Sequence, residues 1–459
     1  PTCRNVGQSF RLCLKGEDKW GNPSNKYSET FRVSANMSVD GLPDSVTFKE
    51  GGFSLIIEDL SCLKTGDLVI EIVDADGNVA CRTNPMRVVE NTALLPYWGD
   101  LHGQSEETIG TNSARDFYEF GRDKAFLDVC VHQGNDFQIT TEFWKHLNEL
   151  SAEFNEDGRF TVFPGWEWSG NTGLGGDRNV LHMQEGRQIH RSSHALVNDL
   201  SDVTTDSNSA ADLFEDLKGE DCTVFAHIGG RYADIKMAHD NQLERSVEVH
   251  SAWGTFEWLI QDAFEQGYRV GILSNSDGHK GRPGASHPGA TKFGSYGGLS
   301  CMLAPEHSRA GIMEALRKRH HYGTTGCRMV LDARVHFDNP AELFAEDPNL
   351  GDTTSDMVSE AMMGDILRSD DGEVTFRIDV HASSPIERID VRNGLETVEV
   401  VRPYTEIDLG RRIRVLWEGS EYRGRGRETI WDGNDMLDGN TFERMDVINR
   451  YNMDKRFDQ

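Results

Sequence analysis

The sequence predicts a parallel α/β barrel that lies between two domains made mainly of β-strands. Between about residues 93 and 330, short β-branched runs alternate with polar loops and helical patterns. That alternation is typical of parallel strands covered by helices, and roughly 240 residues is the size of one such barrel. On both sides of this region, strand-like runs follow one another without a helical period, which predicts β domains at 1–92 and 331–459.

The acidic composition limits the partners that the chain can have. Its 459 residues carry a formal net charge of -29, which argues against nucleic acid or an anionic membrane as a partner. No run of about 18 apolar residues occurs, so we expect no membrane span. The expected partner is an anionic small molecule.

We expect a cytoplasmic protein, or a periplasmic one if a signal peptide has been removed. The oligomeric state stays open.

The first domain, 1–92, is expected to be an immunoglobulin-like β-sandwich. Turn residues such as Gly21, Pro23 and Gly77 separate its short β-branched runs at even spacing. The predicted strands are 9–14, 30–34, 53–57 and 68–73. None of its motifs has catalytic chemistry, so we expect a role in packing or presentation. The eight cysteines of the chain are scattered and indicate neither a disulfide scaffold nor a zinc ribbon.

The middle region, 93–330, shows clear helix signals between strand-like runs. Thr140 or Thr141 caps a helix in which Phe143, Leu147 and Phe154 recur at helical spacing. Two further helices are predicted at about 255–266 and 308–320. The predicted strands of this region are 94–97, 127–131, 160–163, 223–226, 246–249 and 268–273.

The last domain, 331–459, is expected to be β-rich. Strands are predicted at 373–380, 386–391 and 413–416. The acidic segment 337–365, which contains several methionines, is expected to be a long surface excursion. The tail after Trp431 lacks a clear final strand, which leaves open that this domain is truncated and that the native chain continues past Gln459.

Carboxylates, imidazoles and amides recur where the predicted strands of the middle region end. In a parallel α/β barrel these ends meet at one face, where function collects, so we expect the side chains to converge. The residues are Asp100, His102, Gln104, Glu167, His182, His227, Glu248, His250, Asp277 and His279. Each one alone has a structural explanation, such as a helix cap or a satisfied buried histidine. Their recurrence at successive strand ends predicts a bound metal.

The residue types suit metal-assisted hydrolysis. Imidazole and carboxylate together bind zinc, manganese or iron, and a carboxylate can bridge two ions whereas a histidine cannot. A metal ion makes water a nucleophile near neutral pH, so no Ser-His-Asp triad is needed. Arg178, Arg231 and Arg282 lie in predicted rim loops. They either stabilise an anionic transition state or serve as ion-pair partners in an acidic protein.

Five motifs, in this order, resemble the polymerase and histidinol phosphatase (PHP) superfamily. They are D-L-H-G-Q at 100–104, P-G-W-E-W at 164–168, D-R-N-V-L-H at 177–182, F-A-H at 225–227 and S-D-G-H at 276–279. The likeness is greatest to a functionally undefined branch of PHP-like hydrolases with β domains on both sides. It covers about residues 93–330, and more loosely the β flanks. It implies a distorted (β/α)7 barrel with up to three divalent ions.

The resemblance also implies a set of metal ligands. By position they are His102, Gln104, Glu167, His182, His227, Asp277 and His279. Glu167 would bridge two ions, and His279 would belong to a third. Two departures weaken the third site: Gln104 stands where the family has a second histidine, and the second strand reads V-H-Q-G-N-D at 131–136, which shifts its histidine to His132 or loses it. We therefore expect one to three ions of zinc, manganese or iron, and favour fewer than three.

The sequence thus predicts a metal-dependent hydrolase, with a small phosphoester as the favoured substrate. Asp277, His279 and His250 are the candidates for proton transfer, and Arg178 is the candidate cation. One alternative is hydrolysis of an amide, or of a bond to a sulfur or halogen leaving group, because the fold does not fix the electrophile. Another is a non-catalytic binding protein with a partly decayed barrel, which Gln104 would fit. Metal content separates the enzyme from the binding protein.

Overall fold

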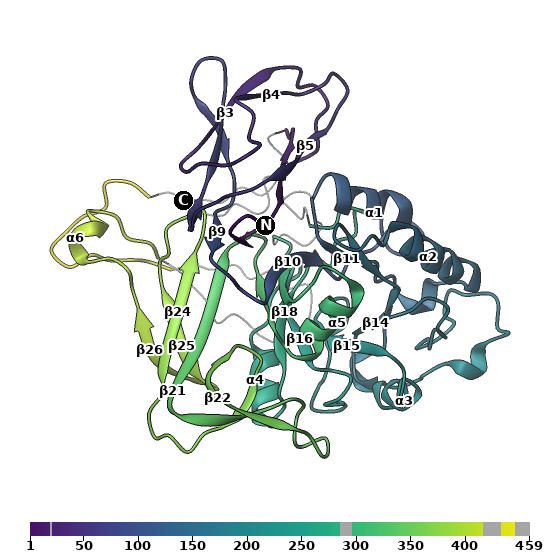
Figure 1. Cartoon of the computed structure of the whole chain (residues 1–459). Helices are drawn as coiled ribbons and strands as arrows, with labels where there is room; N and C mark the ends of the chain where they lie inside the picture. Colours follow the sequence, from purple (N-terminus) through teal and green to yellow (C-terminus); the bar gives the residue numbers. More distant parts are fainter. Residues whose placement is uncertain (19–20, 285–295, 416–432, 446–459) are drawn as a thin grey trace.

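The computed structural model describes residues 1–18, 21–284, 296–415 and 433–445. In this part of the chain, the N-terminal β region has three small sheets around one apolar core (Figure 1). Their strand orders are β4-β3-β7-β8, β1-β9-β6 and β2-β5. The strands are β1 (Cys3–Asn5), β2 (Phe10–Lys15), β3 (Thr30–Ala35), β4 (Ser45–Thr47), β5 (Ser54–Leu60), β6 (Gly66–Leu68), β7 (Ile70–Val73), β8 (Val79–Arg82) and β9 (Met86–Val89). The predicted strands are found, whereas the immunoglobulin-like topology stays a prediction.

The central region is built on two sheets. One has the order β12-β11-β10-β19-β20, with β10, β11 and β12 parallel and β19 antiparallel to both its neighbours. The other has the order β13-β14-β15-β16-β17, with β18 added to β16. Their bounds are β10 (Leu95–Asp100), β11 (Val129–Val131), β12 (Thr161–Phe163), β13 (Gly165–Trp168), β14 (Arg178–His182), β15 (Cys222–Ala226), β16 (Ser246–Ser251), β17 (Gly254–Thr255), β18 (Gly271–Ser274), β19 (Leu299–Ala304) and β20 (His321–Thr324).

The two central sheets meet at two seams. Single parallel bridges join Asn135 to Glu167 at one seam and Gly103 to Gly278 at the other. The described strands therefore give a mixed α/β arrangement, and the closed (β/α)7 barrel of the prediction is not shown. One cause is local. The connection 169–177 between β13 and β14 is too short for the helical crossover that parallel strands need, so β14 returns antiparallel to β13.

Four of the described helices, α1, α2, α3 and α5, begin at a serine or threonine whose side chain caps the helix. The hydroxyl of Thr140 accepts the N–H of Phe143 at the start of α2, and Ser308 caps α5 in the same way. These helices and α4 confirm the predicted helices. Figure 1 shows α1 and α2 next to each other at the edge of the central region. The bounds are α1 (Ala114–Asp123), α2 (Thr141–Phe154), α3 (Ala210–Asp216), α4 (Trp258–Glu265) and α5 (Arg309–Arg317), with 3-10 turns η1 (Asp136–Gln138), η2 (Thr172–Leu174) and η3 (Val203–Thr205).

The C-terminal β region is organised by one long strand, β21, which pairs with β22, β23 and β24. The bounds are β21 (Val330–Phe344), β22 (Ser355–Met362), β23 (Ile366–Arg368), β24 (Thr375–His381), β25 (Ile389–Asn393), β26 (Glu396–Val401) and α6 (Glu406–Leu409). Two of the predicted strands are found as β24 and β25. The third, 413–416, is not found, because residues 413–415 form no strand and residue 416 lies outside the described residues. The expected surface excursion 337–365 is wrong, because much of it forms the β21–β22 hairpin over a small core of Phe337, Ala341 and Ala361. Of the tail after Trp431, the structure describes residues 433–445.

Candidate metal centre

Five buried side chains of ligand type converge where the two central sheets meet. His102, His227 and Asp277 offer ligand atoms within 4.8 Å of one another, and Glu167, Asp177 and His227 do the same. Each of the five is at most 3% exposed. Several imidazoles and carboxylates crowded together away from water are costly to bury unless a cation or protons offset their charge. This combination of donors is one that zinc, manganese and iron accept.

Contacts at the Gly103–Gly278 seam hold His102 against Asp277. The N–H of Asp277 donates to the carbonyl of His102 at 2.8 Å. His102 Nε2 consequently lies 3.3 Å from Asp277 Oδ1 and 3.7 Å from Glu167 Oε2. Asp277 has φ of +45°, a left-handed conformation that is strained for a residue with a Cβ. This backbone strain is consistent with an Asp277 side chain that must point in one particular direction.

The antiparallel return of β14 brings Asp177 to the site. Glu167 of β13 is paired with Asn179, and Arg178 is paired with Ala226 of β15. The residue before β14 and the residue after β15 therefore lie at the same end of the sheet. His227 Nε2 is 3.7 Å from Glu167 Oε1 and 3.9 Å from Asp177 Oδ2.

His182 lies at the other end of β14, opposite Cys222, and the structure does not bring it to the cluster. Its Nε2 accepts the indole N–H of Trp166 at 3.4 Å. Burial lowers the pKa of His182 to about 4, so it is a neutral core histidine. The expectation that His182 is a ligand assumed that β14 runs parallel to its neighbours. Because β14 is antiparallel to its neighbour β13, Asp177 joins the cluster instead of His182.

Glu248 and Asn275 orient the ring of His102. Both carboxylate oxygens of Glu248 lie 3.1–3.2 Å from His102 Nδ1. The amide of Asn275 donates to Glu248 Oε2 at 2.8 Å, and its oxygen accepts the N–H of Leu101 at 2.9 Å. A carboxylate on the second nitrogen of an imidazole is the arrangement that fixes histidine ligands in metalloproteins.

The space between these side chains suits an ion. His102 Nε2 is buried and makes no hydrogen bond to a described residue, although two carboxylates lie within 4 Å of it. Gly229 borders the same space, where a Cβ would lie 3.0 Å from Asp277 Oδ2 and 3.1 Å from His227 Nε2. A cation requires such an environment: a ring nitrogen without a hydrogen-bond donor, nearby carboxylates, and the space that a glycine leaves.

Burial and mutual repulsion set the protonation of the cluster. Burial, helped by the neighbouring His102, lowers the pKa of His227 to about 3, which keeps it in the neutral form that binds metals. Burial acts on His102 in the same direction, but the neighbouring carboxylates of Asp277, Glu248 and Glu167 together outweigh it and raise the pKa of His102 well above its usual value. Burial, and then the charge of Glu167, raise the pKa of Asp177 to about 8. Without a cation the cluster must hold protons, which a divalent ion would displace.

All five residues lie within the region that identifies the family. The family model described as "Protein of unknown function (DUF3604)" matches residues 77–227 and 274–406. The chain belongs to this family. The DUF3604 match covers His102, Glu167, Asp177, His227 and Asp277, whereas Glu248 lies in the interval between its two parts.

Curated relatives of this DUF3604 chain are uncharacterized proteins. One, from Chlamydia pneumoniae, is 24% identical over 355 residues, which is 71% of this chain and 55% of the relative. Another, from Chlamydia trachomatis, is 23% identical over 354 residues, with the same two shares. The chain thus spans about half the length of the curated relatives it matches.

A solved structure with a distant likeness is a two-domain protein from Bacteroides vulgatus that contains a predicted PHP-like metal-dependent phosphoesterase. The TM-score is 0.38 at 12% sequence identity, and the alignment covers 65% of this chain and 90% of the other. In the described residues of the DUF3604 chain, the helices are all too short or too polar to cross a membrane.

Arg231 is the predicted rim arginine that reaches the site. Its Nε donates to Asp177 Oδ1 at 2.8 Å, and its backbone N–H donates to Asp177 Oδ2 at 3.0 Å. Its side chain is 25% exposed and lies over the ring of Phe137. Arg282 instead donates to Asn22 of the N-terminal β region, 2.8 Å away.

Two residues predicted to be catalytic, Arg178 and His250, contact residues outside the metal cluster. Arg178 is fully buried and pairs with Glu244 at 3.0 Å, while its other nitrogens donate to backbone carbonyls. His250 contacts Thr255 Oγ1 at 2.7 Å and the carbonyl of Tyr296 at 2.9 Å, so both its nitrogens are in use. The predictions for these two residues are therefore corrected to structural roles. His250 lies on β16, as its place at a predicted strand end indicated, whereas Arg178, which was expected in a rim loop, is the first residue of β14. Sequence position does not reveal the partners of either side chain.

Three further predicted residues border the cluster. The amide of Gln104 donates to Glu167 Oε2 at 3.1 Å, while its oxygen accepts the hydroxyl of Thr108. Gln104 therefore supports Glu167 as a hydrogen-bond donor. His279 Nε2 lies 3.8 Å from Asp277 Oδ1 on the more exposed side. His132 contacts Ser105 Oγ at 2.8 Å and belongs to neither ligand group.

Sequence reasoning missed Asp177, and it included Asp100 among the converging residues without giving it a role. Asp100 is buried and accepts the backbone N–H groups of Ser276 and Gly284, so it fixes the loop that carries Asp277. Asp177 stood in the D-R-N-V-L-H motif, but only the histidine of that motif was selected as a metal ligand. The signal that points to Asp177 is the short connection 169–177, which favours an antiparallel β14.

Proposed function

We propose that this chain is a metal-dependent hydrolase of a small anionic substrate, with a phosphoester as the first class to test. The observation that carries the proposal is the convergence of the two ligand groups on His227, with all members buried. The ordered motifs that resemble the PHP superfamily favour phosphoester hydrolysis over cleavage of other bonds.

The ligand groups limit how many ions can bind. Both groups include His227, but its Nδ1 faces Asn179, so Nε2 is the nitrogen that remains, and one nitrogen holds one ion. The cluster therefore holds either a single ion or two ions that a carboxylate bridges. Glu167 is placed for bridging, because one of its oxygens faces His102 and the other faces His227. His279, Gln104 and His132 do not assemble a third group in the described part of the chain.

The remaining residues have distinct tasks in hydrolysis. A divalent ion bound here supplies a nucleophilic water at neutral pH and positive charge for the leaving oxygen. Arg231 holds Asp177 through its Nε and backbone, and its partly exposed guanidinium is free to orient an anionic substrate. His279, beside Asp277 and closer to solvent, is placed to move a proton. Asp100 and Glu248 keep Asp277 and His102 in position.

Metal content and activity test the proposal together. The purified protein is expected to hold at least one divalent ion per chain and to hydrolyse phosphomonoesters or phosphodiesters with manganese, zinc or iron. Treatment with a chelator should remove both the metal, measured by mass spectrometry, and the activity, and added metal should restore them. Less than one tightly bound metal per chain, with no effect of chelation, would contradict the proposal. Metal without phosphoester cleavage would contradict only the substrate class.

The link between Glu248 and His102 gives a sharper test. Glu248→Ala is expected to weaken zinc binding about 10- to 100-fold, because His102 loses the acceptor that fixes its ring. Glu248→Gln keeps an acceptor oxygen and should lose less. Competition with a chromophoric chelator measures both affinities. The exposed Glu149→Gln on α2 is the control and should bind like the parent. Unchanged affinity in Glu248→Ala would show that His102 is not a ligand or needs no orienting group.

A further inference from the structure

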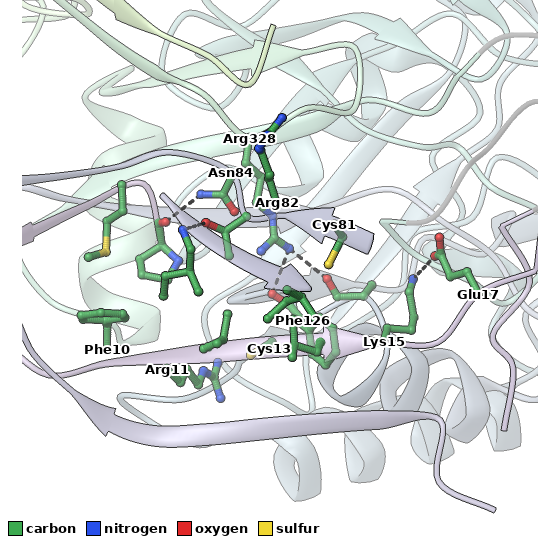
Figure 2. A pocket seen from close by; sticks show the side chains of 18 of the residues that line it. Phe10, Arg11, Cys13, Lys15, Glu17, Cys81, Arg82, Asn84, Phe126 and Arg328 are labelled. Atoms are coloured by element: carbon green, nitrogen blue, oxygen red, sulfur yellow. Dashed lines mark hydrogen bonds and ion pairs between the residues drawn. The ribbon is translucent and has the colours of Figure 1, made fainter. Parts of the chain in front are cut away.

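A second site is formed where the N-terminal β region meets the central region. A cavity of about 670 Å³ lies there. Figure 2 shows side chains from β2, among them Arg11 and Cys13, and from β8, among them Cys81 and Arg82, around it together with Phe126 and Arg328 of the central region. The volume lies within the range of small-molecule sites, which often form between domains, and is far larger than an ordinary packing void.

One part of the lining is apolar and belongs to the core of the β region. Phe10, Leu12 and Leu14 alternate along β2 and reach the cavity with Phe31 and Phe48. All five are less than a tenth exposed and are members of one core cluster. An alkyl chain in contact with them would bury its apolar surface against the protein instead of exposing it to water.

The other part of the lining is positively charged. Five cations and two carboxylates line the cavity, in a chain whose net charge is -29. The carboxylates already have partners, since Glu17 pairs with Lys15 at 2.6 Å and Asp128 accepts the N–H of Trp98 at 2.8 Å. Among the cations, Arg82 is paired with Glu71 at 2.7 Å.

Arg11 lies 3.9 Å from Asp128, and Arg4 also lacks an ion pair among the described residues, so Arg328 is one of two lining cations that a ligand could pair with. Its guanidinium donates to the carbonyls of Ala125 and Phe126, both at 2.9 Å, and forms no ion pair with a carboxylate of the described residues. Burial lowers the pKa of Arg328, and the charge of Asp128, which makes no direct ion pair with it, offsets this only in part. A carboxylate or similar anion would match the fork of this side chain.

We propose that this cavity binds an anionic amphiphile, a single alkyl chain that ends in a carboxylate or another small anionic group. The alkyl chain lies against Phe10, Leu12 and Phe31, and the anion lies at Arg328. The side chains of β8 on the solvent side, Ala80 to Arg82, are exposed and leave an entry path. This site is separate from the candidate metal centre and does not depend on the proposed hydrolase function.

Titration calorimetry with sodium decanoate, below its micelle concentration and with a chelator present, tests the proposal on the full chain. One decanoate per chain is expected, and octanoate should bind about fifteenfold more weakly, because it is two methylenes shorter and each contributes about fourfold. Decanol should bind more weakly than decanoate, and decyltrimethylammonium should not bind. Arg328→Gln should weaken decanoate binding at least tenfold. Arg159→Gln, at an exposed arginine outside the cavity, should leave it unchanged.

If Arg328→Gln fails to fold, methyl NMR of the unaltered protein provides a second test of the proposal that needs no variant. Decanoate should shift the methyl signals of Leu12 and Leu14 and leave those of Leu259, in another core cluster, unchanged. The proposal fails if decanoate shows no saturable binding or if decyltrimethylammonium binds equally well. It also fails if an extended acidic peptide, which would pair with the free edges of β2 and β8, binds here and decanoate does not.

Discussion

Replacing His227 by alanine is expected to weaken metal binding by more than about a hundredfold and to lower turnover by about a thousandfold or more. His227 is the one residue that both ligand groups share, so its loss leaves neither group intact. Loss of a first ligand should exceed the 10- to 100-fold effect typical of the residues that orient ligands. Because the ion contributes several kcal/mol to the reaction, activity should fall with it. Metal analysis and phosphoester assays measure the two effects.

His182→Asn is the matched control for that experiment. The sequence made His182 and His227 equal candidates, but the structure places His182 at the far end of β14 beside Trp166. We expect the control to keep its metal content and activity, even if it melts somewhat earlier. Loss of metal in His182→Asn, with full metal in His227→Ala, would contradict the ligand set proposed here.

Arg178→Met is expected to lower the free energy of unfolding by about 3–5 kcal/mol. The substitution leaves Glu244 buried and charged without its guanidinium partner, and breaking a buried ion pair in this way is costly. The pair is 0% exposed on both sides, so solvent does not screen it. Chemical denaturation monitored by tryptophan fluorescence measures the loss. Arg178→Met protein that remains folded should retain the metal, because among the described residues the Arg178 side chain bonds to Glu244 and to backbone carbonyls outside the cluster.

An exposed pair provides the comparison. Arg317 and Asp221 lie 2.6 Å apart with side chains 33% and 49% exposed, so Arg317→Met should cost less than about 1 kcal/mol. If Arg178→Met is as mild as this control and yet abolishes activity, Arg178 acts on substrate and the structural role is wrong. Adding Glu244→Leu to Arg178→Met should restore most of the stability, because the uncompensated charge is then removed.

Local patterns predicted the elements, and they predicted part of the site. Buried β-branched runs and capping residues such as Thr140 are short-range signals, so the strands and helices of the central region follow from them. His102, Glu167, His227 and Asp277 were found because each follows or ends a strand. That reasoning needs only the position of a strand end and the chemistry of the residue there.

What the sequence could not supply is the direction in which strands pair. The choice of His182 over Asp177 depended on a parallel β14, and the choice of Arg178 and His250 depended on side chains that face the site. The direction of a strand, and the side to which its side chains point, are set by contacts between distant segments, such as the pairing of Arg178 with Glu244. The β21–β22 hairpin was missed for a related reason, since acidic exposed strands lack the apolar alternation that marks a strand.

The distribution of ligands between the two central sheets has a consequence for cohesion. His102 comes from the end of β10 in one sheet, whereas Glu167, Asp177, His227 and Asp277 follow or belong to strands of the other. A cation held by both sets would crosslink the halves of the central region. Metal affinity and docking of the halves would then be thermodynamically linked, and each would strengthen the other. Trp98 of β10 also donates to Thr2 in the N-terminal β region, so the crosslink would extend to that part of the chain.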